Sequence, residues 1–145
     1  MVSDTSLKNL RATGAFARKV ASGLTGREVL LLSGDLGAGK TTFVRYLAKA
    51  LGMDPTWVSS PSYTLVQRYP AGARGFGTLH ADLYRLGAPE DLEALGIEEE
   101  WGSPDLVVVE WPELLEKAGL PAGRPIHRLA FCACADGSRI VRWER

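Results

Sequence analysis

The sequence predicts an α/β fold with a mostly parallel sheet core, antiparallel hairpins, and helices on both faces. Two short runs, residues 29–32 and 106–109, are apolar throughout, as is typical of parallel strands that are buried on both faces. Segments with the apolar spacing of amphipathic helices accompany these runs. A chain of 145 residues can bury one continuous core, so we expect a single domain over residues 1–145.

The first apolar run leads directly into a phosphate-binding pattern. Residues 34–42 read Gly-Asp-Leu-Gly-Ala-Gly-Lys-Thr-Thr and match G-x-x-x-x-G-K-[ST] in full. In this pattern the backbone N–H groups surround phosphate oxygens, Lys40 neutralises the β- and γ-phosphates, and the Thr41 hydroxyl binds a magnesium ion. An apolar helical stripe follows Lys40, and Gly52 is a suitable end for that helix. Strand, loop and helix therefore stand in the order of a P-loop NTPase-like sheet, which predicts binding of ATP and Mg²⁺.

The loop residues expected to contact the nucleotide are Gly34, Asp35, Leu36, Gly37, Ala38, Gly39, Lys40, Thr41 and Thr42.

Two carboxylates are candidates for the chemistry. Glu110 directly follows the second apolar run, where a carboxylate at a strand end holds or orients the magnesium ion. Asp is more usual there, so Glu110 has two possible roles, a metal contact or a base that positions the attacking water, and we favour the metal contact. Residues 78–86 alternate so that His80, Asp82 and Tyr84 share one strand face. Asp82 is a candidate for ordering water or magnesium, the alternative being a solvated hairpin strand, and for His80 we favour a structural role.

The elements before the second apolar run are predicted from local signals. Asn9 is a suitable N-cap for a first helix, which Gly26 would end. Residues 63–69 have the β-branched and aromatic character of a strand. Residues 78–86 would return antiparallel to them as a hairpin partner.

The remaining elements lie on both sides of the second apolar run, residues 106–109. Residues 90–95 and 113–118 have the pattern of short helices. Residues 126–135 and 139–143 read as a hairpin that turns at Asp136-Gly137.

Charge and cysteine usage limit the function classes. The 17 basic and 17 acidic side chains cancel, so no overall field would attract nucleic acid, and we expect no DNA binding.

Cys132 and Cys134 would face the same way on one strand, where a disulfide is poorly placed, and we expect reduced core thiols. No apolar run approaches the ~20 residues that span a bilayer. We therefore expect a cytoplasmic protein without a membrane partner.

Five arginines crowd the last quarter of the chain, and we interpret them as a solvated surface rather than a phosphate-binding patch. They are Arg124, Arg128, Arg139, Arg142 and Arg145.

Four stretches in this order resemble the TsaE family. They are the loop at residues 34–43, Ser-Pro-Ser-Tyr-Thr-Leu-Val at 60–66, His-Ala-Asp-Leu-Tyr-Arg-Leu at 80–86 and Glu-Trp-Pro-Glu at 110–113. The resemblance covers nearly the whole chain. It implies an ATPase required for threonylcarbamoyladenosine formation on tRNA beside the anticodon. Such a protein acts with TsaD and TsaB, resets that transferase complex by hydrolysing ATP, and meets tRNA through the complex.

The same resemblance implies roles for individual residues. Lys40 and Thr41 would bind phosphates, Thr41 and Glu110 would hold magnesium, and Asp82 would be needed for hydrolysis. Trp111 and residues 60–64, which include Thr64, would form a wall that senses the nucleotide. Leu10 would lie near the adenine.

Two other functions stay open from the sequence. A small-molecule kinase uses the same loop but needs an acceptor pocket and usually a lid, for which the chain has little room. A non-hydrolytic binding module, whose partner affinity depends on nucleotide occupancy, is the second alternative.

Overall fold

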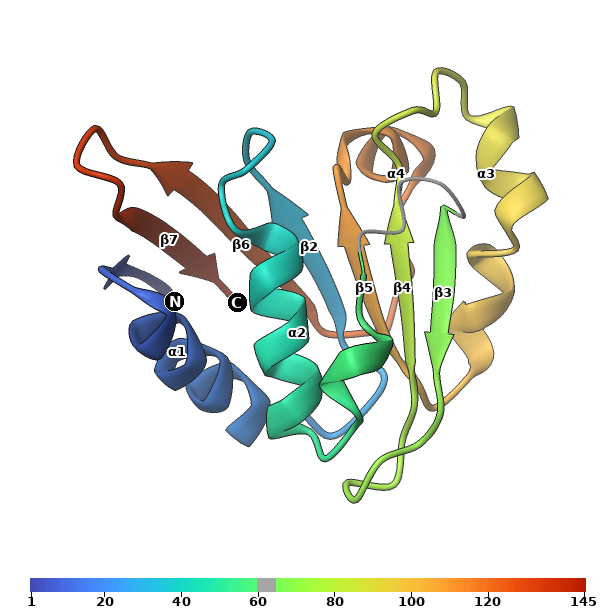
Figure 1. Cartoon of the computed structure of the whole chain (residues 1–145). Helices are drawn as coiled ribbons and strands as arrows, with labels where there is room; N and C mark the ends of the chain where they lie inside the picture. Colours follow the sequence, from blue (N-terminus) through green and yellow to red (C-terminus); the bar gives the residue numbers. More distant parts are fainter. Residues whose placement is uncertain (60–64) are drawn as a thin grey trace.

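One mixed sheet with helices on both faces forms the framework of the molecule (Figure 1). The computed structural model describes residues 1–59 and 65–145. Within these residues the strands are β1 (Val2–Leu7), β2 (Val29–Ser33), β3 (Val66–Tyr69), β4 (Thr78–Asp82), β5 (Leu106–Glu110), β6 (Ile126–Ala133) and β7 (Arg139–Glu144). Their order across the sheet is β1-β7-β6-β2-β5-β4-β3.

The centre of the sheet is parallel and its margins are antiparallel. β2 pairs in parallel with both β5 and β6, and β5 pairs in parallel with β4. β3 forms an antiparallel hairpin with β4, β6 forms another with β7, and β1 adds to β7. This arrangement confirms the predicted parallel core with antiparallel hairpins. It also brings the carboxyl ends of β2, β4 and β5 to one edge of the sheet, the upper edge in Figure 1.

Two hydrophobic cores separate the sheet from its helices. The helical segments are α1 (Leu10–Ser22), α2 (Lys40–Ala50), η1 (Pro55–Trp57), α3 (Glu90–Leu95), η2 (Glu98–Gly102) and α4 (Glu113–Ala118). Leu30 and Leu32 of β2 pack into the core under α1 and α2, whereas Val29 and Leu31 pack into the core under α3 and α4. Because alternate side chains enter opposite cores, an unbroken apolar run is what such a strand requires.

The limits of several elements differ from the prediction, and one strand was not predicted. α1 ends at Ser22, with Gly23 as its C-cap, so it is shorter than the helix expected to reach Gly26. β4 ends at Asp82 rather than near residue 86, because the Asp82 carboxylate accepts a bond from the Tyr84 N–H at 2.9 Å and turns the chain. β1 was not predicted. Leu7 is its one buried residue, so the strand has no apolar pattern to find.

The thiols and one arginine also differ from expectation. Cys132 is exposed and Cys134 is half-buried, and both are free, so they are not core thiols. Cys132 lies on the face of β6 opposite to Leu129 and Phe131, which pack into the core under α1 and α2. Arg124 is buried rather than solvated, and its guanidinium donates to main-chain carbonyls of neighbouring segments.

Among the helices in the described part of the chain, none has the length and apolar character that crossing a membrane requires.

Candidate functional site

The loop between β2 and α2 forms the centre of the candidate site. β2 ends at Ser33 and α2 begins at Lys40, so residues 34–39 make the connection as predicted. Gly39 precedes the helix in a left-handed conformation, with φ of 106°, which glycine adopts without steric cost. The first turn of α2 carries no acidic side chain. Its N-terminal N–H groups therefore present an uncompensated partial positive charge to an anion.

A cavity of about 340 Å³ opens over this loop. Its lining comes from the loop, the start of α2, the ends of β4 and β5, and the start of β7. The lining residues are Leu36, Gly37, Gly39, Lys40, Thr41, Thr42, Asp82, Glu110, Trp111 and Arg139.

Lys40 is held under an aromatic ring. Its side chain is buried, with 5% of its surface exposed. Its Nζ donates to the carbonyl of Gly34 and lies 3.7 Å from the centre of the Trp111 ring. Burial lowers the pKa of Lys40, while the charges of Glu110 and Asp82 oppose that shift. The Lys40 ammonium thus contacts a carbonyl and an aromatic ring, neither of which carries a full negative charge. A phosphate bound in the loop would supply that charge.

Trp111 reaches Lys40 because of an unusual backbone conformation. Its φ is 57°, in the left-handed region that few residues other than glycine adopt. The Trp111 N–H donates to the carbonyl of Leu32 at 3.1 Å, and its ring lies 4.8 Å from the ring of Tyr84. These contacts on both sides hold a strained residue over the cavity, an arrangement that is common at functional sites.

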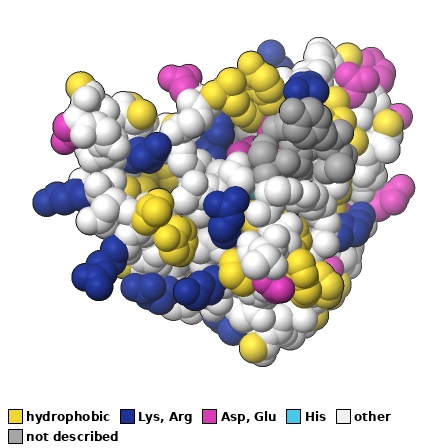
Figure 2. All heavy atoms as spheres, in the orientation of Figure 1, with side chains coloured by type: hydrophobic (Ala, Val, Ile, Leu, Met, Phe, Trp, Pro, Cys, Tyr) yellow, Lys and Arg dark blue, Asp and Glu magenta, His cyan; other side chains and the backbone are white. Residues whose placement is uncertain are grey.

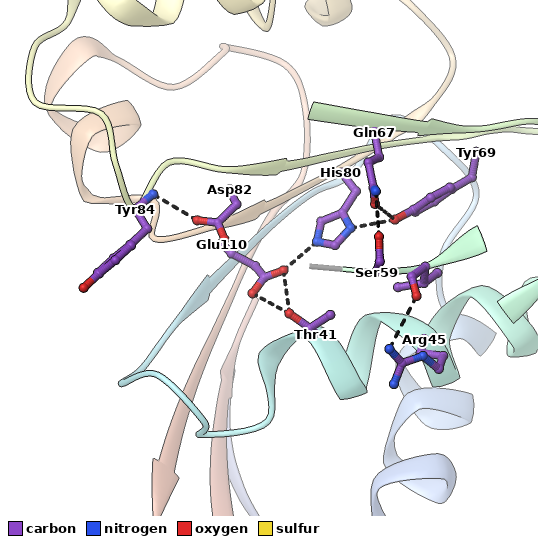
Figure 3. A network of polar contacts seen from close by, with 10 residues as sticks. Thr41, Arg45, Ser59, Gln67, Tyr69, His80, Asp82, Tyr84 and Glu110 are labelled. Carbon is purple, nitrogen blue, oxygen red and sulfur yellow. Dashed lines mark hydrogen bonds and ion pairs between the residues drawn. The ribbon is translucent and has the colours of Figure 1, made fainter. Parts of the chain in front are cut away.

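Glu110 is the meeting point of a hydrogen-bond network (Figure 3). The Thr41 hydroxyl lies 3.1 Å and 3.2 Å from its two carboxylate oxygens. His80 Nε2 lies 2.6 Å from Glu110 Oε2, and His80 Nδ1 lies 2.8 Å from the Tyr69 hydroxyl. The Tyr69 hydroxyl in turn donates to Gln67 Oε1 at 2.7 Å.

The network runs through three side chains of the β3–β4 hairpin. The Tyr69 hydroxyl contacts both Gln67 and His80, and His80 joins Tyr69 to Glu110 through its two ring nitrogens. Burial raises the pKa of Tyr69, with the charge of Glu110 adding to the effect, so this hydroxyl stays neutral. The result is a Glu110 carboxylate fixed in place from the side of the sheet.

Asp82 lies beside Glu110. The two residues are register partners at the ends of the parallel strands β4 and β5, and both are buried. In Figure 3 their carboxylates stand next to each other above Thr41. The predicted strand face carrying His80 and Asp82 is thus turned into the molecule and lines the site rather than facing solvent.

The donor set fits a magnesium ion. One hydroxyl, from Thr41, and two carboxylates, from Glu110 and Asp82, border the same cavity, and oxygen ligands of this kind suit Mg²⁺. The described residues contain no group of three histidine, cysteine or carboxylate side chains that could hold a metal by themselves. Mg²⁺ is usually held by one or two protein ligands together with phosphate and water.

A second cavity, of about 300 Å³, continues from the first. It is bordered by the start of α1 and by the turn between β6 and β7. Leu10, whose side chain is 60% exposed, lines it together with Asn9 and Thr13. The two cavities share three lining residues, which are Gly39, Thr42 and Arg139.

The predicted loop residues are divided between cavity, surface and core. Three of them do not line either of the two cavities. The carbonyl of Gly34 accepts a bond from Lys40, Asp35 is exposed, and Ala38 is buried in the core under α2. Leu36 is exposed at the tip and lines the first cavity. Thr64 lies outside the described residues.

Arg139 was missed as a site residue by the sequence interpretation. Its Nη2 donates to the carbonyl of Gly37 at 3.0 Å, across 102 positions of the chain. No local signal marks it, because the sequence does not reveal that the start of β7 lies beside the loop.

Fold and site together define an α/β protein in which a loop with the phosphate-binding pattern lies at the carboxyl ends of the parallel central strands. The family model described as "Threonylcarbamoyl adenosine biosynthesis protein TsaE" matches residues 7–139. The chain therefore belongs to the TsaE family.

Individual relatives agree with this assignment. The tRNA threonylcarbamoyladenosine biosynthesis protein TsaE of Rickettsia conorii is 38% identical over 111 residues, which are 77% of this chain and 62% of that protein. The protein of the same name from Bacillus subtilis is 37% identical over 109 residues, 75% of this chain and 66% of that protein. The chain thus spans less than two thirds of the length of these relatives. A crystal structure of YdiB from Bacillus subtilis superposes with a TM-score of 0.76 at 28% identity, covering 99% of this chain and 84% of that one.

Proposed function

We propose that this chain binds ATP and Mg²⁺ and hydrolyses ATP as a component of threonylcarbamoyladenosine formation on tRNA in the cytoplasm. It would act with TsaD and TsaB, reset the transferase complex between turnovers, and meet tRNA through that complex rather than carry out the transfer. The observation that carries the proposal is the convergence of Lys40, Thr41, Asp82 and Glu110 on one cavity above the loop. Membership of the TsaE family supports the pathway.

Each residue has a role in this proposal. Lys40 and the loop N–H groups hold the β- and γ-phosphates. Thr41 and Glu110 would hold the magnesium ion, which would neutralise part of the phosphate charge. Asp82 orients the attacking water, and Trp111 covers the phosphate end. The second cavity, with Leu10 at its rim, takes the nucleoside.

The first test measures hydrolysis. Magnesium-dependent release of phosphate from ATP is followed for the chain alone and with TsaD and TsaB, and Lys40→Ala supplies the blank. Turnover that rises when the partners are added supports the proposal. If ATP binds but is not consumed with the partners present, the chain is a nucleotide-dependent binding module, and if phosphate passes to an acceptor other than water it is a kinase.

The site roles are tested by two variants and a matched control. Glu110→Gln and Asp82→Asn are each expected to lower hydrolysis by about 100-fold or more, since each removes a charge at the reacting phosphate. ADP binding should persist in both. Glu90→Gln is the control, because Glu90 is exposed at the start of α3 and lies outside the cavity lining. Normal hydrolysis by both site variants would overturn these assignments.

A further inference from the structure

The junction between the two cavities contains an arginine whose hydrogen-bonding capacity is mostly unused. The Arg139 guanidinium has five N–H donors. Its Nη2 donates to the carbonyl of Gly37 at 3.0 Å, and its Nη1 has one long contact with the carbonyl of Gly137 at 3.5 Å. Its Nε is shielded from solvent and has no partner among the described residues.

The charge of Arg139 is also unmatched by an acid. Two arginines of the same hairpin differ in this respect: Arg142 binds the Asp4 carboxylate and Arg128 binds that of Glu116. None of the ion pairs found in the described part of the chain includes Arg139. A guanidinium held against two carbonyls, with a shielded unpaired N–H, is a site that an anion would complete.

The position of Arg139 indicates which anion. The side chain lies directly against the loop, since a Cβ placed on Gly39 would stand 3.2 Å from its Nε. The first cavity contains the groups suited to the β- and γ-phosphates, and the second lacks Lys40, Asp82 and Glu110. A nucleotide that occupies both must cross the junction formed by Gly39, Thr42 and Arg139. Its α-phosphate is the group that joins the nucleoside to the other phosphates.

We propose that Arg139 is an α-phosphate-binding residue, brought to the loop by the β6–β7 hairpin. The inference rests on the proposed binding of ATP. It adds a contact that the loop pattern does not contain, since that pattern supplies its cation, Lys40, at the β/γ end. Because the α-phosphate is present in ATP, ADP and AMP alike, Arg139 would hold the nucleotide both before and after hydrolysis.

A series of ligands tests the assignment. Binding of adenosine, AMP and ADP is measured by competition against a fluorescent ADP analogue, for the wild type, Arg139→Gln and Arg139→Lys. Arg142→Gln serves as the control, because Arg142 lies on the same strand but is exposed and paired with Asp4. Arg139→Gln is expected to weaken AMP and ADP by the same factor, about tenfold or more, and to leave adenosine unchanged. Arg139→Lys should restore part of the loss, and Arg142→Gln should match the wild type.

Each other outcome overturns the inference in a recognisable way. A loss for ADP without a loss for AMP would place Arg139 at the β-phosphate. An equal loss for all three ligands, or none, would leave it a structural tie between hairpin and loop. If Arg139→Gln does not fold, the same ratios are taken from Arg139→Lys, and the ³¹P resonance of the α-phosphate of bound ADP should shift between wild type and this variant. Failure of the wild type to bind any nucleotide would instead refute the proposed function itself.

Discussion

Glu110 illustrates how a single side chain depends on distant parts of the sequence. Its carboxylate is contacted by Thr41 at the start of α2 and by His80 of β4, and His80 is contacted by Tyr69 of β3. His80 itself has 0% of its surface exposed. A structural role for His80 was favoured from the sequence, and the structure specifies that role as holding the carboxylate of a site residue.

Removal of His80 is predicted to destabilise the fold. His80→Ala would leave both the buried Glu110 carboxylate and the Tyr69 hydroxyl without the ring nitrogens that contact them. We expect the free energy of unfolding to fall by about 3 kcal/mol, as when one member of a buried pair is removed. Urea denaturation measures this loss. Tyr69→Phe is the matched control, because it removes the far end of the network and keeps the His80–Glu110 contact, and it should cost about 1 kcal/mol. Equal losses for the two variants would contradict this account.

At the scale of elements, the β2–α2 loop depends on its fit against β6 as well as on its own sequence. Gly34 has a φ of 133°, and a Cβ there would stand 2.3 Å from the carbonyl oxygen of Phe131 in β6. Gly37 has a φ of 78°, but a Cβ there would meet nothing within 4 Å. Gly34 and Gly37 lie in the same loop, but the fold constrains Gly34 more tightly than Gly37.

This difference predicts unequal effects of alanine. Gly34→Ala should lower the free energy of unfolding by about 3 kcal/mol or more, because backbone strain and a main-chain collision add. Gly37→Ala has the conformational cost alone, about 1 to 2 kcal/mol. Midpoints of urea or thermal unfolding compare the two variants directly. A larger loss for Gly37→Ala would refute the packing argument.

Elements were predictable where their signals are local. The two central strands, the α3 and α4 helices and the turn between β6 and β7 follow from apolar runs, short-range spacing and turn residues, and the structure confirms them. β1 escaped prediction because it is a margin strand whose one buried residue is Leu7. Its partner β7 lies at the opposite end of the sequence. The Met1 amino group donates to the main-chain carbonyl of Arg145 at 2.8 Å, and Figure 1 shows the two termini side by side.

At the scale of the whole molecule, the zero net charge conceals two oppositely charged layers. The exposed cations over α1 and α2 are Lys8, Arg11, Arg18, Lys19, Arg45 and Lys49. The exposed acids over the α3–α4 side are Glu90, Asp91, Glu93, Glu98, Glu99, Glu113 and Glu116. Figure 2 shows Lys and Arg side chains gathered over α1 and acids towards α3. Any contact made through one of these layers should therefore weaken as salt is added.

The stability of the molecule is predicted to depend on pH through His127. Its Nδ1 accepts a hydrogen bond from Trp143 Nε1 at 3.0 Å, which joins β6 to β7 around a neutral ring. Burial holds the pKa of His127 below its ordinary 6.5. The unfolded chain therefore binds a proton before the folded chain does, so stability is highest above pH 6.5 and falls as the pH drops below it. Thermal unfolding from pH 8 to pH 5 measures this trend. In His127→Gln the decline below pH 6.5 should be shallower, and an unchanged profile would exclude His127 as its source.

The sequence by itself determined the fold class, the position of the loop that carries the phosphate-binding pattern, and the candidates Lys40, Thr41, Asp82 and Glu110. These follow from short-range chemistry: apolar runs, helix spacing, and a loop pattern that is contiguous in the chain. Only the tertiary structure decided that His80 and Tyr69 support Glu110 and that Arg139 reaches the loop. Such contacts depend on which strands become neighbours in the sheet. No local pattern encodes this, because the contact between Arg139 and Gly37, for example, joins residues that are 102 positions apart in the chain.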